Sequence, residues 1–272
     1  MKLITIGDNV TDCYLSDGLY YPGGQAVNVA VNAKRDGAEK VNYLGIFGDD
    51  DRAEYIRACL EREGVTTLRC RKVYAPTAQP GVRIGPGGER IFVRGPRDSC
   101  QHLFALSLVS EDYEIIRSYD VCHTTNEAHI ETQLPALSAE IPVSFDFSTR
   151  NDDAYLRAVC PFLTYAFFSG SGLRDEEVSG LIEKVLALGP RIVGVTRGEQ
   201  GSVFSDGKKS YRHEAQKVKA TDTMGAGDAF IAAFLTRYTD NGDMETSLDF
   251  AADRAAYACT VNGGFGYPHK NV

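Results

Sequence analysis

The clearest chemical signal in the chain is a turn of small residues that leads directly into an apolar helical run. The turn is Asp222-Thr223-Met224-Gly225-Ala226-Gly227-Asp228, and residues 229–235 continue as Ala-Phe-Ile-Ala-Ala-Phe-Leu. Because Gly225, Ala226 and Gly227 carry almost no side chain, the N–H groups at the helix start can approach an anion closely. A carboxylate beside such a site, here Asp228, can accept a hydroxyl proton while the amides stabilise a transferring phosphoryl group. The segment therefore predicts phosphoryl transfer, although the helix dipole alone also favours an acidic residue there.

Two weaker patterns accompany this turn. Gly23-Gly24 precedes a helical run that carries Asn28 four residues after the second glycine. Alone, it would be read as a turn before a helix and a polar helix position. Thr196, Gly198 and Gly201 form a T-x-G-x-x-G segment after an apolar run, which permits a tight loop where α/β proteins bind ligands. Within it, Arg197 is either a phosphate ligand or a solvated surface residue.

The elements that must hold these motifs alternate between short apolar runs and amphipathic helical stretches. Strands that alternate with helices of this length indicate βαβ units and a parallel sheet covered on both faces. We predict strands at residues 3–7, 41–47, 120–125, 143–147, 165–169 and 191–196, and helices at 23–35, 51–63, 131–139, 152–159 and 175–188.

Two segments break this alternation. Residues 10–22 lack a helical period, and residues 68–97 contain two β-rich runs around Gly85-Pro86-Gly87-Gly88, a hairpin-like pattern. We expect them to form a small β lid over a site, within a single domain that spans residues 1–272. An ordinary hairpin insertion would give the same pattern.

Charge and cysteine usage argue against several classes of function. The chain has 29 Lys and Arg against 37 Asp and Glu, a net charge of −8, so a nucleic-acid partner is not expected. No apolar stretch reaches the roughly 18 residues of a membrane helix, so no membrane association is expected. Seven scattered cysteines without a C-x-x-C pair, and no signal-peptide pattern, predict a cytoplasmic protein with reduced thiols.

The motifs together resemble those of the ribokinase-like (PfkB) carbohydrate kinases. Residues 222–228 are similar to the carboxy-terminal signature of that family, and Gly23-Gly24 with Asn28 is similar to its amino-terminal motif. Gly7, followed five residues on by Asp12, resembles its opening strand. The order of these motifs and their separation along the chain resemble those of the family over nearly the whole sequence. Three segments are most similar to the fructoselysine 6-kinase branch: residues 6–9, 110–113 and 146–148.

The resemblance implies a ribokinase-like three-layer α/β sandwich with a mostly parallel central sheet and a small β lid. It also implies ATP-dependent transfer of the γ-phosphate to a primary hydroxyl of a sugar. The best match for the acceptor is fructoselysine or a related fructosamine at the 6-hydroxyl. Asp228 would be the base, and the backbone of Gly225, Ala226 and Gly227 the anion hole. The other expected site residues are Asp8, Asp12, Gly23, Gly24, Asn28, Arg94, Asn126 and Glu127 for the substrate, and Thr196, Gly198, Gly201 and Thr223 for the nucleotide.

Cofactor expectations follow from the same resemblance. Mg²⁺ is expected because ATP enters as its complex. Many family members carry an Asn-x-x-Glu motif that organises the metal-bound waters, but this chain has Ser169-Gly170-Ser171-Gly172 after the strand at 165–169. Asp222 resembles a position near a potassium site in some relatives, which suggests K⁺ as a further ligand.

The expected partners are a small sugar and ATP, together with a second copy of the chain bound through the β lid. Two alternatives to a fructosamine kinase stay open. One is a nucleoside kinase or a simple-sugar (ribose or fructose) kinase of the same superfamily. The other is a non-catalytic sensor that binds a sugar.

Overall fold

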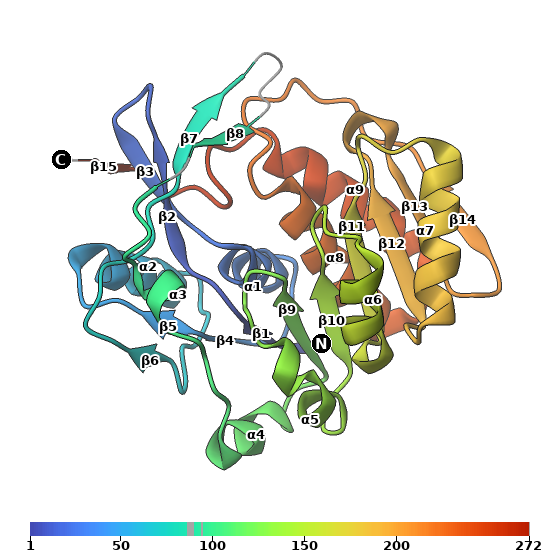
Figure 1. Cartoon of the computed structure of the whole chain (residues 1–272). Helices are drawn as coiled ribbons and strands as arrows, with labels where there is room; N and C mark the ends of the chain where they lie inside the picture. Colours follow the sequence, from blue (N-terminus) through green and yellow to red (C-terminus); the bar gives the residue numbers. More distant parts are fainter. Residues whose placement is uncertain (86–89, 94, 272) are drawn as a thin grey trace.

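The centre of the structure, a computed structural model that describes residues 1–85, 90–93 and 95–271, is an eight-stranded sheet (Figure 1). Its strand order is β14-β13-β12-β11-β10-β9-β1-β4. The run from β12 to β4 is parallel, and β13 and β14 extend it antiparallel. The strands are β1 (Lys2–Ile6), β4 (Lys40–Leu44), β9 (Val121–Thr125), β10 (Val143–Asp146), β11 (Tyr165–Ser169), β12 (Ile192–Thr196), β13 (Ser202–Ser205) and β14 (Ser210–His213).

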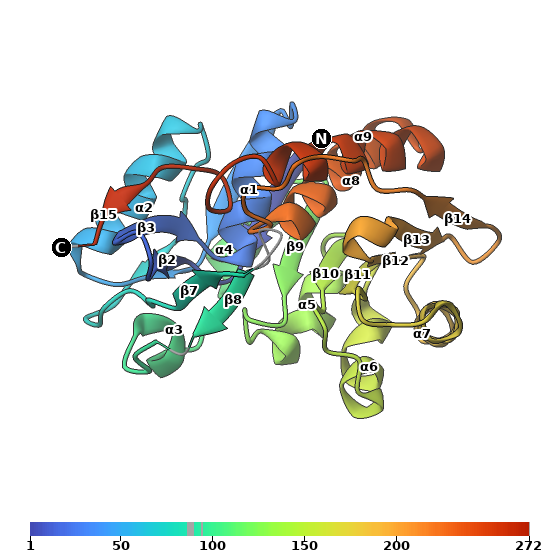
Figure 2. The same ribbon diagram turned by 90° about the horizontal axis from the view of Figure 1, so that it is seen from above.

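Alternating side chains of the buried strands divide the core into two layers. In β11, Tyr165 and Phe167 enter one apolar cluster, whereas Ala166 and Phe168 enter the other. This is the period-two alternation of a strand that is covered on both faces. Helices α1, α8 and α9 cover one face and α5, α6 and α7 the other (Figure 2).

Local signals set where the helices begin and end. The Asp50 side chain accepts a hydrogen bond from the N–H of Ala53 (3.0 Å) and so caps α2. α8 begins after Gly225 and ends before Gly242, both in the left-handed conformation that suits glycine. The helices are α1 (Gln25–Arg35), α2 (Asp51–Arg62), α3 (Cys100–Leu103), α4 (Ser110–Ile116), α5 (Leu134–Ser138), α6 (Asp153–Val159), α7 (Asp175–Ala187), α8 (Ala226–Asn241) and α9 (Met244–Ala258), with 3₁₀ turns at Glu131–Gln133, Cys160–Phe162 and Gly198–Gln200.

A second, five-stranded sheet lies beside the first, in the order β15-β3-β2-β7-β8 (Figure 1). It contains strands from both segments that we expected in the lid, and we call it the lid sheet. It also takes in β15 from the far carboxyl end of the chain, which the sequence analysis did not anticipate. Its strands are β2 (Val10–Tyr14), β3 (Leu19–Gly23), β7 (Gly81–Ile84), β8 (Arg90–Val93) and β15 (His269–Lys270).

The expected α/β architecture, a mostly parallel sheet with a smaller β sheet beside it, is confirmed, with local differences from the expected elements. The apolar run at 41–47 is not one strand, because it is interrupted at Gly45 between β4 and the short β5 (Ile46–Phe47). A Cβ at Gly45 would lie 2.0 Å from the Tyr43 hydroxyl and 2.5 Å from the Gly7 carbonyl oxygen. β5 then pairs with β6 (Arg71–Lys72) outside both larger sheets. Much of the predicted tip around Gly85-Pro86-Gly87-Gly88 lies outside the described residues.

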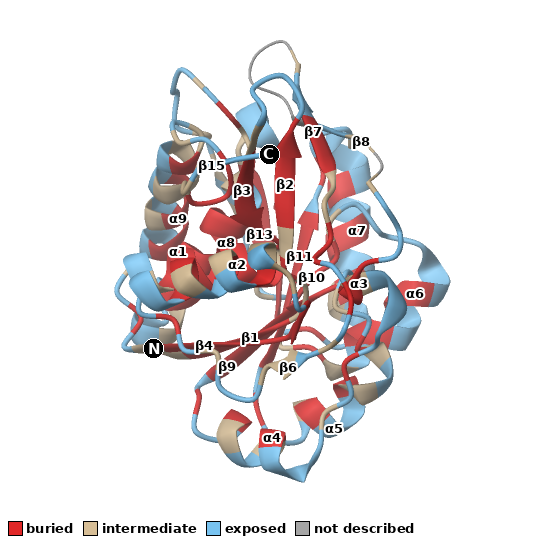
Figure 3. Cartoon of the chain, turned by 90° about the vertical axis from the view of Figure 1, so that its left-hand side faces the viewer, coloured by how far each residue is buried: buried red, intermediate tan, exposed pale blue. Residues whose placement is uncertain are grey.

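Burial follows this layering, since the central strands are buried and the outward helix faces exposed (Figure 3). No helix within the described ranges combines the length and apolar character needed to cross a membrane.

Candidate active site

The amino end of α8 brings the predicted anion site and the predicted base together. Gly225 precedes the helix with φ of 71°, and a Cβ there would lie 2.7 Å from the Gly264 Cα atom. Only glycine fits this close approach of two backbones. The first turn of a helix presents N–H groups that lack intrahelical acceptors, and Asp228 lies in that turn. The geometry therefore places amides and a carboxylate side by side.

Asn28 holds the Asp228 carboxylate from the neighbouring helix α1. Its side-chain amide donates a hydrogen bond to Asp228 Oδ2 at 2.7 Å, although the two residues are 200 positions apart. Asn28 is 3% exposed and Asp228 8% exposed. The Asn28 Oδ1 atom has no hydrogen-bond partner among the described residues. The pair thus combines a fixed carboxylate with a buried acceptor that a hydroxyl-bearing ligand would satisfy.

The start of α1 supplies a second acidic group. The Asp8 carboxylate accepts hydrogen bonds from the N–H groups of Gln25 (3.2 Å) and Ala26 (3.4 Å). The pKa of Asp8 is raised to about 6, chiefly because the carboxyl is buried, and the negative charges of Glu127 and Asp228 contribute to the rise. Asp8, Glu127 and Asp228 therefore share one electrostatic environment.

Asp8 and Glu127 also line a small cleft with space of about 30 Å³, beyond the ends of β1 and β9. Glu127 is exposed and accepts a hydrogen bond from the Asn126 side-chain amide at 2.8 Å. Neither carboxylate takes part in an ion pair within the described part of the chain. Among the residues that the structure describes, no ion pair therefore neutralises these two carboxylates. Arg94, which we expected here, lies outside the described residues.

Gly23 and Gly24 shape the approach to α1. A Cβ on Gly23 would lie 2.1 Å from Asp12 Oδ2, so a glycine there leaves room for that carboxylate, which is 3% exposed. Gly24 has φ of 106°, and a Cβ would lie 2.7 Å from the Asp8 carbonyl oxygen. Both predicted glycines thus permit close approaches that a side chain would prevent.

The predicted nucleotide loop joins β12 to β13. Gly201 has φ of 80°, and a Cβ there would lie 1.9 Å from the His213 carbonyl oxygen. Thr196 donates from its hydroxyl to the Phe168 carbonyl oxygen (3.3 Å), while Gly198 faces open space. Thr223 belongs to the separate loop before α8, where its carbonyl accepts from the N–H of Ala226 (3.3 Å).

The interpretation of Arg197 as a solvated surface residue is wrong, whereas its interpretation as a phosphate ligand stays a prediction. Arg197 is 7% exposed, donates to Asp175 Oδ1 at 2.6 Å and donates to the Leu173 carbonyl oxygen at 2.8 Å. It joins the loop after β12 to the start of α7. A long-range ion pair of this kind has no local signal in the sequence.

Asp222 lies where three segments meet. Its carboxylate accepts hydrogen bonds from the Tyr14 hydroxyl, from the Met224 N–H (2.9 Å) and from the Gly263 N–H (2.8 Å). A carboxylate offers about four acceptor positions, so these donors occupy most of them. Among the described residues, no three His, Cys, Asp or Glu side chains are grouped so that they could hold a metal ion. Sequence reasoning missed Tyr14 and Gly263 as partners of this site.

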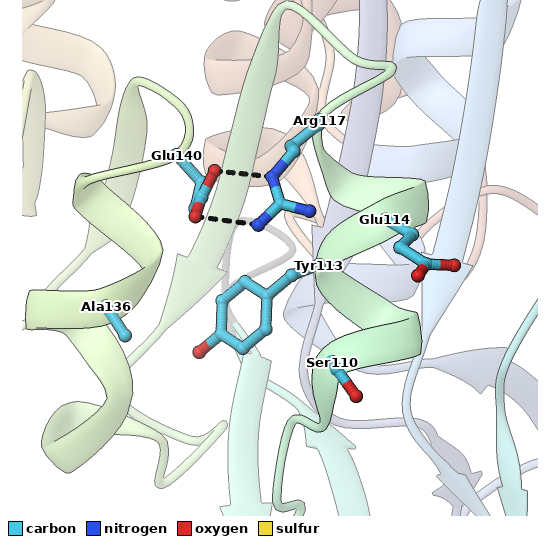
Figure 4. A pocket seen from close by; sticks show the side chains of 6 residues that line it. All are labelled: Ser110, Tyr113, Glu114, Arg117, Ala136 and Glu140. Carbon is cyan, nitrogen blue, oxygen red and sulfur yellow. Dashed lines mark hydrogen bonds and ion pairs between the residues drawn. The ribbon is translucent and has the colours of Figure 1, made fainter.

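A pocket of about 400 Å³ lies between α4 and α5 and is remote from this chemistry (Figure 4). The Arg117–Glu140 ion pair (2.6 Å) crosses it. Arg117 precedes β9 and Glu140 precedes β10, so the pocket lies at the amino edge of the parallel strands. Ligands of such sheets bind at the carboxyl edge, which excludes this pocket as the candidate site.

Comparison with known proteins agrees with this geometry. The model of the family described as "pfkB family carbohydrate kinase" matches residues 3–266. Fructosamine kinase FrlD of Bacillus subtilis (strain 168) is 42% identical over 272 residues, which cover 99% of this chain and 95% of that protein. Fructoselysine 6-kinase of Escherichia coli (strain K12) is 35% identical over 86% of this chain and 87% of that protein.

Solved structures share the fold at lower identity. Ribokinase of Arabidopsis thaliana, complexed with ribose and ATP, gives a TM-score of 0.81 at 21% identity, with 96% of this chain and 93% of that chain covered. Ribokinase from Giardia lamblia gives 0.82 at 19% identity, with 97% and 94% covered.

The two glycines of the turn should respond differently to alanine. We predict that Gly225→Ala lowers the free energy of unfolding by at least about 1–2 kcal/mol, because the left-handed conformation is costly and the Cβ would overlap Gly264. Gly227→Ala is the matched control. Apart from its chain neighbours and its own helix backbone, no described atom lies within 4 Å of the added Cβ, so helix propensity should keep or raise stability by up to about 1 kcal/mol. Urea unfolding measures both, and equal losses would contradict the backbone contact.

Proposed function

This chain belongs to the PfkB family of carbohydrate kinases, and we propose that its acceptor is a fructosamine, phosphorylated at the 6-hydroxyl. It is an ATP-dependent sugar kinase. The observation that carries the choice of acceptor is the 42% identity to fructosamine kinase FrlD over nearly the whole chain. The acidic cleft at Asp8 and Glu127 supports it, because a fructosamine carries a cationic secondary amine at C1 where fructose carries a neutral hydroxyl.

In this proposal the first turn of α8 performs the chemistry. The backbone of Gly225, Ala226 and Gly227 binds the γ-phosphate of ATP and stabilises the charge that spreads over its oxygens. Asp228, oriented by Asn28, accepts the proton of the sugar hydroxyl as that oxygen attacks phosphorus in line. The phosphorus–oxygen bond to ADP breaks, and ADP leaves with its electron pair.

We assign the sugar and the nucleotide to other predicted residues. Asp12, Asn28 and the backbone at Gly23-Gly24 bind the sugar hydroxyls, and Asn126 positions Glu127 at the amine end. Thr196, Gly198 and Gly201 contact the nucleotide on the other side, with Thr223 beside the phosphates. The lid sheet excludes water that would otherwise hydrolyse ATP.

Two metal ions are expected at this site, and they would be held differently. Mg²⁺ enters on the phosphates of ATP, and the lack of a grouped set of His, Cys, Asp or Glu ligands in the described ranges is consistent with a metal held mainly by phosphate and water. A K⁺ ion near Asp222 stays a prediction. Location in the cytoplasm also stays a prediction. The prediction that residues 1–272 form one domain with a lid has the same status as a prediction.

The base assignment predicts a selective loss of turnover. Asp228→Asn should lower kcat by about 10²–10⁴-fold, because the amide cannot accept the hydroxyl proton. The melting temperature should stay within a few degrees of wild type, because the amide oxygen can still accept from Asn28. Asp253→Asn, an exposed position on α9, is the matched control and should keep full activity. Turnover of Asp228→Asn near that of the control would refute the role.

A substrate panel tests the acceptor. With Mg-ATP, kcat/KM for fructoselysine should exceed that for fructose by at least about ten-fold, the expected effect of one added charged interaction. Ribose and nucleosides should be poorer still. Rapid phosphorylation of a nucleoside without turnover of any fructosamine would replace this acceptor with the nucleoside alternative. Tight sugar binding without ATP consumption would favour the sensor.

We also propose that two copies of the chain pair through the lid. Ile84 on β7 and Ile91 and Phe92 on the edge strand β8 are 37%, 49% and 55% exposed. Apolar groups on an exposed sheet edge are typical of a protein contact. Sedimentation at micromolar concentration should give twice the 29.7 kDa chain mass, and Ile91→Asp should shift it to the monomer. A monomeric wild type would contradict this contact.

A further inference from the structure

The loop before α8 packs into the lid sheet as well as against its own helix. Met224, directly before Gly225, is 4% exposed and belongs to a small apolar cluster with Tyr14, Tyr21 and Val82 of the lid sheet. The Tyr14 and Tyr21 rings meet edge to face, with centroids 4.8 Å apart. Met224, which precedes the proposed anion site, therefore packs in the apolar cluster of the lid sheet.

A buried hydrogen bond joins the same two parts. The Tyr14 hydroxyl, on β2, donates to Asp222 Oδ2 across 208 positions of sequence. Tyr14 is 3% exposed and Asp222 is fully buried. Burial and the adjacent Asp222 carboxylate raise the pKa of Tyr14 above its usual range, so the phenol stays protonated and is the donor.

The carboxyl-terminal loop completes the contact. The Gly263 N–H donates to the same Asp222 oxygen at 2.8 Å, and a Cβ on Gly263 would lie 2.7 Å from the Tyr21 ring. The next residue, Gly264, is the one that packs against Gly225. Asp222 Oδ1 meanwhile accepts from the Met224 N–H and fixes the bend of the loop. A displacement of the lid would thus strain the anion site through Met224, which precedes Gly225 in the chain, and through Gly264, which packs against Gly225.

We propose that Tyr14 and Met224 are positioning residues that make the geometry of the anion site depend on the docked lid. Asp12, a predicted sugar ligand, lies two residues from Tyr14 on the same strand, so a sugar that holds β2 in place also holds the Tyr14–Asp222 contact. Sugar binding then orders the amides that receive the γ-phosphate. ATP hydrolysis without an acceptor is suppressed, because the amides are not fully arranged until the lid is docked.

Paired variants on the two faces of the lid test this coupling. Tyr14→Phe keeps the ring and removes the hydrogen bond, and it should lower kcat by about ten-fold with a smaller change in KM for the sugar. Tyr20→Phe is the matched control: Tyr20 is also buried in the lid, but its ring contacts Tyr55 and His269 instead. The control should keep wild-type kcat.

A second pair of variants, at Met224, tests the coupling even if the Tyr14→Phe protein fails to fold. Met224→Ala should lower kcat similarly, and Met224→Leu, which keeps the apolar volume, should restore most of it. Hydrogen exchange supplies a readout that does not require turnover. The amides of residues 224–227 should exchange faster in Tyr14→Phe and in Met224→Ala than in wild type or in Tyr20→Phe. Wild-type kcat together with unchanged exchange at these amides would overturn the proposal, whatever the acceptor sugar proves to be.

Discussion

The phosphoryl site that we propose at the amino end of α8 depends on two backbones that meet there without side chains. Gly225 and Gly264 approach so closely that one Cβ would bring them into conflict. This contact fixes where the helix begins and therefore where its first N–H groups and Asp228 point. The hydrogen bond from Asn28 then sets the orientation of the carboxylate. The proposed base and the proposed anion site belong to one turn, so neither can move independently of the other.

The rest of the molecule brings distant segments to that turn. Parallel strands deliver Asp8 and Glu127 to one edge of the sheet. There burial chiefly raises the pKa of Asp8, and the negative charges of Glu127 and Asp228 add to the rise. The lid sheet adds Asp12 and contacts the loop before α8 through Asp222 and Met224. His123, by contrast, is an interior residue: burial lowers its pKa to about 3, and its ring contacts the Ser144 hydroxyl at 2.9 Å. We therefore assign His123 to the interior of the sheet and not to the reaction.

The sequence predicted the layers and motifs because their signals are local. Alternating apolar runs and the bounds of α2 and α7 follow from neighbours a few residues apart, as do the glycines at 23–24 and 225. Long-range contacts left no such signal. The burial of Arg197 against Asp175, the Tyr14–Asp222 hydrogen bond and the addition of β15 to the lid each join residues that no periodicity connects. The roles of the site residues therefore rest on motif likeness and on the geometry around Asp228.

A crystal structure with ADP, aluminium fluoride and the fructosamine acceptor would examine this turn most directly. We expect the planar fluoride group within about 3.2 Å of backbone nitrogens of residues 225–227. We also expect the acceptor 6-oxygen within about the same distance of an Asp228 carboxylate oxygen, in line with the leaving oxygen of ADP. A fluoride group bound away from the start of α8, or an acceptor oxygen out of reach of Asp228, would contradict the proposed roles of this turn.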